Sequence, residues 1–386
     1  MKTATDVVNH SGAGTTVSKE GILALARFYS PNADAVSFYF CRAEVADNAH
    51  REEKISVKDL VQEAIGNAPE PISASLMKDV KRILTVAEDI RISASRLRIV
   101  FACGGENIWK EFDLPFARPE YILQFGRRFS LAPLIFAMQS ISPYGVVLLE
   151  SGKARAFIVH GTEIEEIFDR FEVEDLSLHA QDSRVGWSSH IDSNQREHEK
   201  AYFKEQFHRL HGIMAEHHID RLVIGCREDL WGEIESQFAN LGKNNPIGRF
   251  HLPNFAIDPA QVLRLATPLI EESRRMRVMD VLREINESSS RSTLGVSDVM
   301  QTLMEGRVQK LVLGQLREQN ISECKSCGRM AAIASQRCVF CGSADICCMT
   351  AEEGLLRQAL LTDAEILFVE EDAAPGFDGA AALLRY

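Results

Sequence analysis

Val146-Val-Leu-Leu-Glu-Ser-Gly-Lys-Ala-Arg-Ala-Phe-Ile-Val159 is the stretch that decides the fold. It predicts two strands joined by a tight turn, because apolar and β-branched runs flank a Ser-Gly-Lys sequence in which glycine supplies the turn geometry. We expect residues 163–168 to add a third strand. Farther along, Leu222-Val-Ile-Gly-Cys226 is wholly apolar, as is typical of a strand buried in the centre of a mixed sheet. These strands predict an α/β middle domain over residues 129–268.

The segment before it, residues 1–128, predicts a small α/β domain. β-branched and aromatic residues indicate strands at 36–40 and 98–103. Apolar residues at helical spacing indicate helices at 56–65 and 72–87. The densest group of basic side chains in the chain lies here, and three of its members are our candidates for an rRNA or tRNA contact: Arg91, Arg96 and Arg98.

The C-terminal segment, residues 269–386, alternates helices and strands around a cysteine-rich insert at 322–346. The same rules predict helices at 268–286, 296–304 and 352–361, and strands at 308–313 and 366–370. The whole chain is therefore expected to be an α/β protein of three domains.

Two Cys-x-x-Cys pairs in the insert carry the strongest chemical signal. The residues are Cys324, Cys327, Cys338 and Cys341. A spacing of two lets both sulfurs of a tight turn meet one ion, and two such knuckles complete a tetrahedron. Four thiolates suit zinc best, with iron as the less favoured ion. The insert has few apolar residues, so we expect a structural zinc to hold it as a zinc ribbon.

Composition limits the class of protein. The chain has 386 residues, with 45% hydrophobic and 25% charged residues, which is typical of a globular protein of two to four domains. No apolar run approaches a membrane span, and the N-terminus lacks the apolar core of a signal peptide, so we expect a cytoplasmic protein without a membrane partner. The net charge of −12 excludes a general cationic coat for nucleic acid, although local basic patches remain compatible with it.

Three places in the chain resemble the archaeo-eukaryotic peptide chain release factor family, which includes Pelota, and in particular its bacterial branch. They are the terminus Gly379-Ala-Ala-Ala-Leu-Leu-Arg-Tyr386, the strand Gly306-Arg-Val-Gln-Lys-Leu-Val-Leu313 with the cysteine pairs, and the middle segment with its hairpin and glycine-bearing loop. The resemblance implies an RNase H-like middle domain and an α-β-α third domain that carries the zinc ribbon. It also implies a tRNA mimic whose partners are the ribosome, rRNA and tRNA, with a translational GTPase as a further candidate.

The loop that the resemblance implies for the tRNA end departs from the family pattern. Related bacterial members have Gly-Gly-Trp-Ser-Gln, whereas this chain has Val185, Gly186, Trp187, Ser188 and Ser189. Ser189 therefore stands where the glutamine would be, and Gln195 follows six residues later. Ser189 and Gln195 are the candidate catalytic residues for peptide release, and we predict little or no intrinsic peptidyl-tRNA hydrolysis.

Three functions remain open at this point. The first is a ribosome-associated termination or rescue factor, and the second is a ribosome-binding adaptor or stress factor that does not hydrolyse peptidyl-tRNA. The middle segment has 13 basic and 20 acidic residues, a net charge of −7 that favours the second over the first. The third is an RNase H-like nuclease, which needs neighbouring carboxylates for paired metal ions, with Glu150 and Asp220 as candidates.

Overall fold

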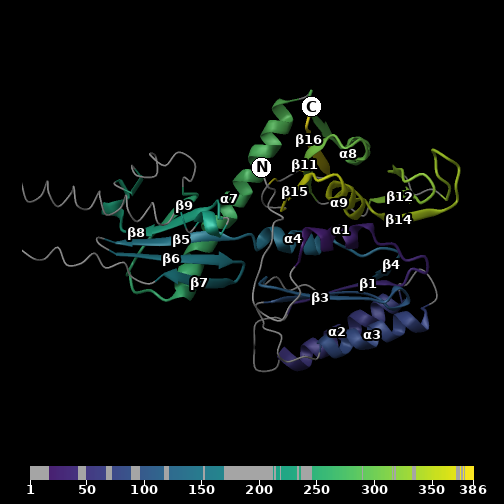
Figure 1. Cartoon of the computed structure of the whole chain (residues 1–386), viewed down its shortest axis with the longest axis horizontal. Coiled ribbons are helices and arrows are strands. Elements are labelled where there is room, and N and C mark those ends of the chain that lie inside the picture. Colours follow the sequence, from purple (N-terminus) through teal and green to yellow (C-terminus); the bar gives the residue numbers. More distant parts are fainter. Residues whose placement is uncertain are drawn as a thin grey trace, which may run out of the picture. The chain divides into compact units, whose positions relative to one another are not determined.

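The chain divides into two compact units in a computed structural model, one formed by residues 142–274 and the other by residues 1–141 together with 275–386 (Figure 1). The first and third segments predicted from sequence thus fall into one unit. The structure describes residues 17–41, 49–66, 72–87, 96–116, 121–150, 153–168, 212, 214–217, 219–232, 234–235, 246–288, 290–314, 316, 319–332, 336–370, 374, 377 and 379–386.

The unit of residues 142–274 is built on a five-stranded mixed sheet of order β7-β6-β5-β8-β9. β5 (Tyr144–Glu150), β6 (Lys153–His160) and β7 (Glu163–Phe168) form the predicted antiparallel hairpin and third strand. β8 (Leu222–Cys226) and β9 (Gly248–His251) continue the sheet in parallel to β5.

Both faces of β5 are buried, which explains why its sequence is apolar without alternation. Val147 and Leu149 belong to one core, and Val146 and Leu148 belong to the core on the opposite face. Neighbouring β8 comes so close that a side chain on Gly225 would not fit. A Cβ there would lie 2.6 Å from Leu148 Cδ2 and 2.6 Å from Phe250 Cζ. Glycine is therefore required for close strand and side-chain packing at this point.

The helix predicted at 268–286 begins earlier than expected. α7 spans Pro259–Glu287 and contains Pro268 in its interior. The prediction took the proline for a helix start, but Val262, Ala266 and Ile270 line one side of α7 and are buried in the core of the mixed sheet. Packing along this side offsets the hydrogen bond that proline cannot donate. No helix in the described ranges, the 29-residue α7 included, is long and apolar enough to cross a membrane.

The N-terminal part of the other unit is a four-stranded antiparallel sheet of order β3-β2-β1-β4. Its strands are β1 (Ala35–Cys41), β2 (Leu97–Cys103), β3 (Ile108–Leu114) and β4 (Tyr121–Gly126). α2 (Ala49–Gly66) and α3 (Ala74–Ala87) cover one face, as Figure 1 shows, so the predicted strands at 36–40 and 98–103 and both predicted helices are confirmed. β3 and β4 were not expected.

The C-terminal part of this unit is an α-β-α arrangement around a four-stranded sheet of order β10-β16-β11-β15. The strands are β10 (Ser292–Leu294), β11 (Val308–Leu313), β15 (Glu365–Phe368) and β16 (Ala380–Leu384). Alternate residues of the two central strands face opposite sides. Leu311 and Ala382 share a core with α8 (Val296–Met304) and α9 (Ala351–Leu361), whereas Val312 and Ala381 share a core with α7.

One continuous apolar core joins the N-terminal and C-terminal parts of this unit. It runs from Tyr39 and Phe101 of the first sheet, through α1 (Lys19–Arg27) and α4 (Ala132–Ser140), to α9 and the second sheet. The two sheets are therefore parts of one packed body and not separately folded cores.

Two charged residues on α9 complete this interface. The carboxylate of Glu353 accepts hydrogen bonds from the backbone N–H groups of Leu131 and Ala132, each at 2.8 Å, at the N-terminus of α4. One turn later, Arg357 donates to the carbonyls of Ala26 at 2.5 Å and Phe129 at 2.6 Å. The carboxylate of Glu353 thus accepts from free N–H groups at the N-terminus of α4, and the guanidinium of Arg357 donates to a carbonyl near the C-terminus of α1. Both are arrangements that the helix dipole favours. Burial lowers the pKa of Arg357 to about 10, against the opposing effect of nearby Glu353.

Candidate metal centre

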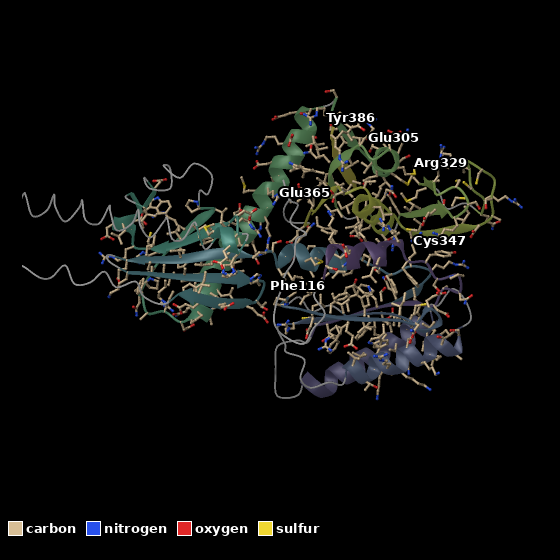
Figure 2. The ribbon with its side chains drawn as sticks, in the orientation of Figure 1. Phe116, Glu305, Arg329, Cys347, Glu365 and Tyr386 are labelled. Carbon is tan, nitrogen blue, oxygen red and sulfur yellow. The ribbon has the colours of Figure 1, made fainter. Side chains whose placement is uncertain are left out.

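The two Cys-x-x-Cys pairs meet at one end of a small three-stranded sheet. The sheet has the order β13-β12-β14, with β12 at Asn320–Cys324, β13 at Met330–Ala331 and β14 at Ile346–Thr350. Figure 2 labels Arg329 and Cys347 in this part of the chain. Cys324 ends β12, Cys327 lies in the turn that follows, and Cys338 and Cys341 lie in the connection between β13 and β14.

The four sulfurs are brought to one point. All four Sγ atoms lie within 4.8 Å of one another, and the Cys324–Cys341 and Cys327–Cys338 pairs are each 3.6 Å apart. These distances exclude disulfide bonds. A tetrahedral ion with Zn–S bonds of about 2.3 Å would separate its sulfurs by about 3.8 Å. The arrangement fits such an ion with little movement.

The two knuckles repeat the same backbone design. Gly328 N donates to Cys324 O at 2.8 Å, and Gly342 N donates to Cys338 O at 2.9 Å. Both glycines are in the left-handed region, with φ of 71° and 77°. At the first position of each pair, Cys324 N donates to Arg329 O, and Cys338 N donates to Ser343 O. The insert is thus a pseudo-twofold pair of turns around the sulfur cluster.

The backbone also supplies donors to the sulfurs. Although burial raises the pKa of Cys338, the N–H groups of Phe340 and Cys341 and the neighbouring thiols lower it to about 6. Burial likewise opposes a lowered pKa at Cys324, where the N–H of Cys327 is the main lowering influence. At Cys341 the N–H of Ser343 lowers the pKa, but the thiols, Cys324 foremost, raise it to about 12. The pKa of one thiol of each pair, Cys324 and Cys338, is thus lowered, and a nearby cation would favour ionisation of all four thiols together.

The cluster is therefore suited to hold a metal ion in a closed site. Four protein sulfurs leave no position for a substrate, so such an ion would stabilise the insert and not catalyse a reaction. Cys347 and Cys348 are not part of the cluster. Cys347 lies on β14, where burial raises the pKa of its thiol, and Cys348 is exposed.

Residues beside the first knuckle attach it to the N-terminal part of the same unit. Glu323 binds Arg128 through two hydrogen bonds of 2.8 and 2.6 Å. The ammonium of Lys325 lies 4.2 Å from the ring centre of Tyr29, and the guanidinium of Arg128 lies 5.6 Å from it. Sequence reasoning did not find these anchors, because they join residues about 200 to 300 positions apart.

Two of the three candidate RNA-contact residues are engaged within the chain. Arg98 pairs with Glu111 at 3.4 Å and Asp113 at 3.1 Å on the neighbouring strand, and Arg96 pairs with Asp113 at 3.4 Å. Arg91 lies outside the described residues. The RNA contact stays a prediction. Arg96 and Arg98 could contact RNA only while each is also paired with a carboxylate of β3.

The loop that the family resemblance implied for the tRNA end lies outside the described residues. This applies to Gly186, Trp187, Ser188, Ser189 and Gln195 alike. Their roles therefore stay predictions.

The candidate pair for a nuclease is separated by the sheet register. β5 and β8 run in parallel with Gly145 opposite Leu222 and Leu149 opposite Cys226. Asp220 precedes β8, whereas Glu150 ends β5, so about seven residues of strand, or roughly 23 Å, lie between their levels. Two carboxylates that far apart cannot hold a pair of metal ions. The sequence offered this pair only as a possibility, with nothing to place the two side chains together, and the parallel register keeps them apart.

The described chain is thus an α/β protein of several sheets, with a mixed-sheet unit and a second unit that carries a four-cysteine centre. Residues 130–271, which include nearly all of the mixed-sheet unit, match the sequence model of bacterial archaeo-eukaryotic release factor family 10. This match confirms the predicted resemblance to the bacterial branch of release factors. No curated protein matches the chain.

Solved structures of release-factor-like proteins also match over most of the chain. Pelota of Archaeoglobus fulgidus is 13% identical, with 96% of this chain and 92% of that chain covered and a TM-score of 0.36. Dom34 of S. cerevisiae, described as a translation termination-like factor, is 12% identical, with coverage of 93% and 96% and a TM-score of 0.42. The family match over residues 130–271 is the stronger finding, and the functional proposal rests on it.

Proposed function

We propose that the protein is a release-factor-like, ribosome-associated translation termination or rescue factor that acts as a tRNA mimic. The observation that carries the proposal is the family match over residues 130–271. The strand order β7-β6-β5-β8-β9 supports it, because three antiparallel strands followed by two parallel ones is the arrangement expected of an RNase H-like middle domain.

The cofactor in this proposal is one structural zinc ion held by Cys324, Cys327, Cys338 and Cys341. The sulfur separations of 3.6 Å and the backbone donors around them support it. Zinc would fix the two knuckles, and through Glu323 and Arg128 it would stabilise the attachment of the insert to the rest of its unit.

Ribosome association can be tested by co-sedimentation with purified bacterial ribosomes over a salt series. Contacts with rRNA release counterions, so binding should weaken steadily as salt rises. Absence of the protein from the ribosome pellet at low salt would contradict the proposal. An Arg91→Glu variant tests the predicted RNA contact directly, whereas reversal of Arg98 would place a new carboxylate beside Glu111 and Asp113 and weaken the sheet.

Whether the factor hydrolyses peptidyl-tRNA is a separate question. We propose that it does not, because Ser189 is too short to present a carboxamide where the family has glutamine, and loss of position can cost about 100-fold in rate. The assay uses ribosomes that carry labelled peptidyl-tRNA. Release at release-factor rates that disappears in Gln195→Ala would overturn this view and make Gln195 catalytic. Release that survives Gln195→Ala would instead implicate Ser188, Ser189 or backbone groups.

The second candidate function is a ribosome-binding adaptor or stress factor without hydrolytic activity. The net charge of −7 on residues 129–268 favours it, since unpaired carboxylates are repelled by the phosphates that surround a tRNA site. Ribosome binding with no release in either the wild-type protein or Gln195→Ala would support this candidate. The proposal of a termination or rescue factor also predicts a translational GTPase as a partner and a cytoplasmic location.

A further inference from the structure

The two knuckles are equivalent in backbone but not in side chains. The pseudo-twofold relation places Ser326 in correspondence with Phe340, and Ser343 in correspondence with Arg329. On one side of the centre, the hydroxyls of Ser326 and Ser343 are 2.7 Å apart. On the equivalent side, the guanidinium of Arg329 lies 5.0 Å from the ring centre of Phe340. Because a serine pair occupies the equivalent site, the metal centre does not by itself require the Arg–Phe pair.

The first knuckle is turned toward its own chain and the second is not. Lys325 lies on the ring of Tyr29 and its side chain is only 19% exposed. Its counterpart Val339 is 61% exposed, and the adjacent Phe340 is 50% exposed. We call Val339, Phe340 and Arg329 the outer knuckle face. Its two apolar side chains are among the few large hydrophobic residues exposed in the described chain.

Arg329 on this face lacks the carboxylate partner that many other arginines of the described chain have. Arg98 and Arg128, for example, each have a carboxylate oxygen within 3.5 Å of the guanidinium, and the chain's net charge of −12 makes such partners plentiful. Within the described part of the chain, no carboxylate pairs with Arg329, whose cation contacts the face of Phe340. An exposed aromatic ring with an unneutralised arginine stacked on it has the two features that unpaired nucleotides use: a stacking surface and a phosphate ligand.

We propose that the outer knuckle face binds unpaired nucleotides of RNA. A base would stack on the Phe340–Arg329 pair, Val339 would extend the apolar contact, and the guanidinium would contact an adjacent phosphate. The proposal rests on the proposed ribosome association and assigns to it a specific contact. An acidic protein segment is the alternative occupant, but it would leave the flat, exposed ring of Phe340 without a matching partner.

The pseudo-twofold relation supplies a designed variant for the test. Arg329→Ser combined with Phe340→Ser copies the serine pair that the structure already has at the equivalent positions, so fold and metal content should be retained. Ser326→Ala combined with Ser343→Ala is the matched control on the other side. Elemental analysis should find the same zinc content in both variants and in the wild-type protein.

Two measurements on the full zinc-loaded chain decide the question. Fluorescence anisotropy with labelled oligouridylate should show an affinity about 5–100-fold lower for the Arg329→Ser/Phe340→Ser variant, the effect of one lost base stack, and no change for the control. Co-sedimentation with ribosomes should be weakened in the same variant only.

The other outcomes are distinct. Unchanged oligouridylate binding in the Arg329→Ser/Phe340→Ser variant would overturn the RNA contact while leaving ribosome association intact. Loss of ribosome binding without loss of oligouridylate binding would identify a ribosomal protein as the occupant and also overturn it. Failure of the wild-type protein to sediment with ribosomes would instead contradict the proposed function on which the contact rests.

Discussion

Replacement of Glu353 by alanine should loosen the junction between the N-terminal and C-terminal parts of the unit formed by residues 1–141 and 275–386. The side chain is 13% exposed, and its carboxylate accepts three hydrogen bonds, from Leu131 N, Ala132 N and Ser130 Oγ. The N-cap of α4, Leu131, has no side-chain acceptor of its own, so Glu353 provides the cap from another helix.

The cost follows from the groups left without partners. Loss of a helix cap costs about 1 kcal/mol, and a buried donor left unsatisfied costs about 1–3 kcal/mol. Arg357, whose guanidinium is 3.9 Å from Glu353, would also lose its nearest anion. We therefore expect a loss of about 2–4 kcal/mol in the free energy of opening of this region, with part of it recovered by water that enters the site.

Hydrogen exchange measured by mass spectrometry is the suitable assay, because it reports each part of a two-unit chain separately. Peptides from α1 and α4 should lose about 30- to 1000-fold in protection, which corresponds to the expected free energy. Glu352→Gln is the comparison variant, since Glu352 is adjacent and makes none of these bonds, and removal of its buried charge should leave the protection of α4 equal to wild type or higher. Equal protection of α4 in Glu353→Ala and in the comparison variant would refute the reasoning.

Three further predictions concern other parts of the chain. Cys338→Ser should release the metal and deprotect β12–β14, and zinc-free wild-type protein purified without chelator would contradict the assignment. Burial, and then the neighbouring charge of Glu353, raises the pKa of Glu352, so its ionisation as pH rises above about 4.5 should cost stability. The stability of Glu352→Gln relative to wild type, measured by urea titration, should therefore increase from acidic to neutral pH. A difference in unfolding free energy that does not change with pH would argue against this. Gly225→Ala should cost about 1–3 kcal/mol and deprotect β5 and β8, because Leu148 and Phe250 must move; a neutral effect in exchange measurements would mean that the strands separate easily.

Local sequence patterns were sufficient wherever the structural cause is also local. The pairing of β5 with β6 follows from neighbouring residues, and so does the burial of β8, whose five residues are all apolar. The spacing of two residues in each cysteine pair likewise predicted a knuckle, because the turn and its sulfur donors are formed within six residues. The family resemblance added the α-β-α arrangement, which periodicity alone did not show.

Only the tertiary structure decided the features that join distant residues. The capping of α4 by Glu353 and the anchoring of the insert by Arg128 pair residues about 200 or more positions apart, and no local pattern encodes such a partner. The register of β5 against β8 separated Glu150 from Asp220, and the pairing of β2 with β3 placed Arg98 beside two carboxylates. The physical reason is the same in each case: propensity and spacing act over one or two turns of chain, whereas side-chain partners and strand register are selected by the packing of the whole unit.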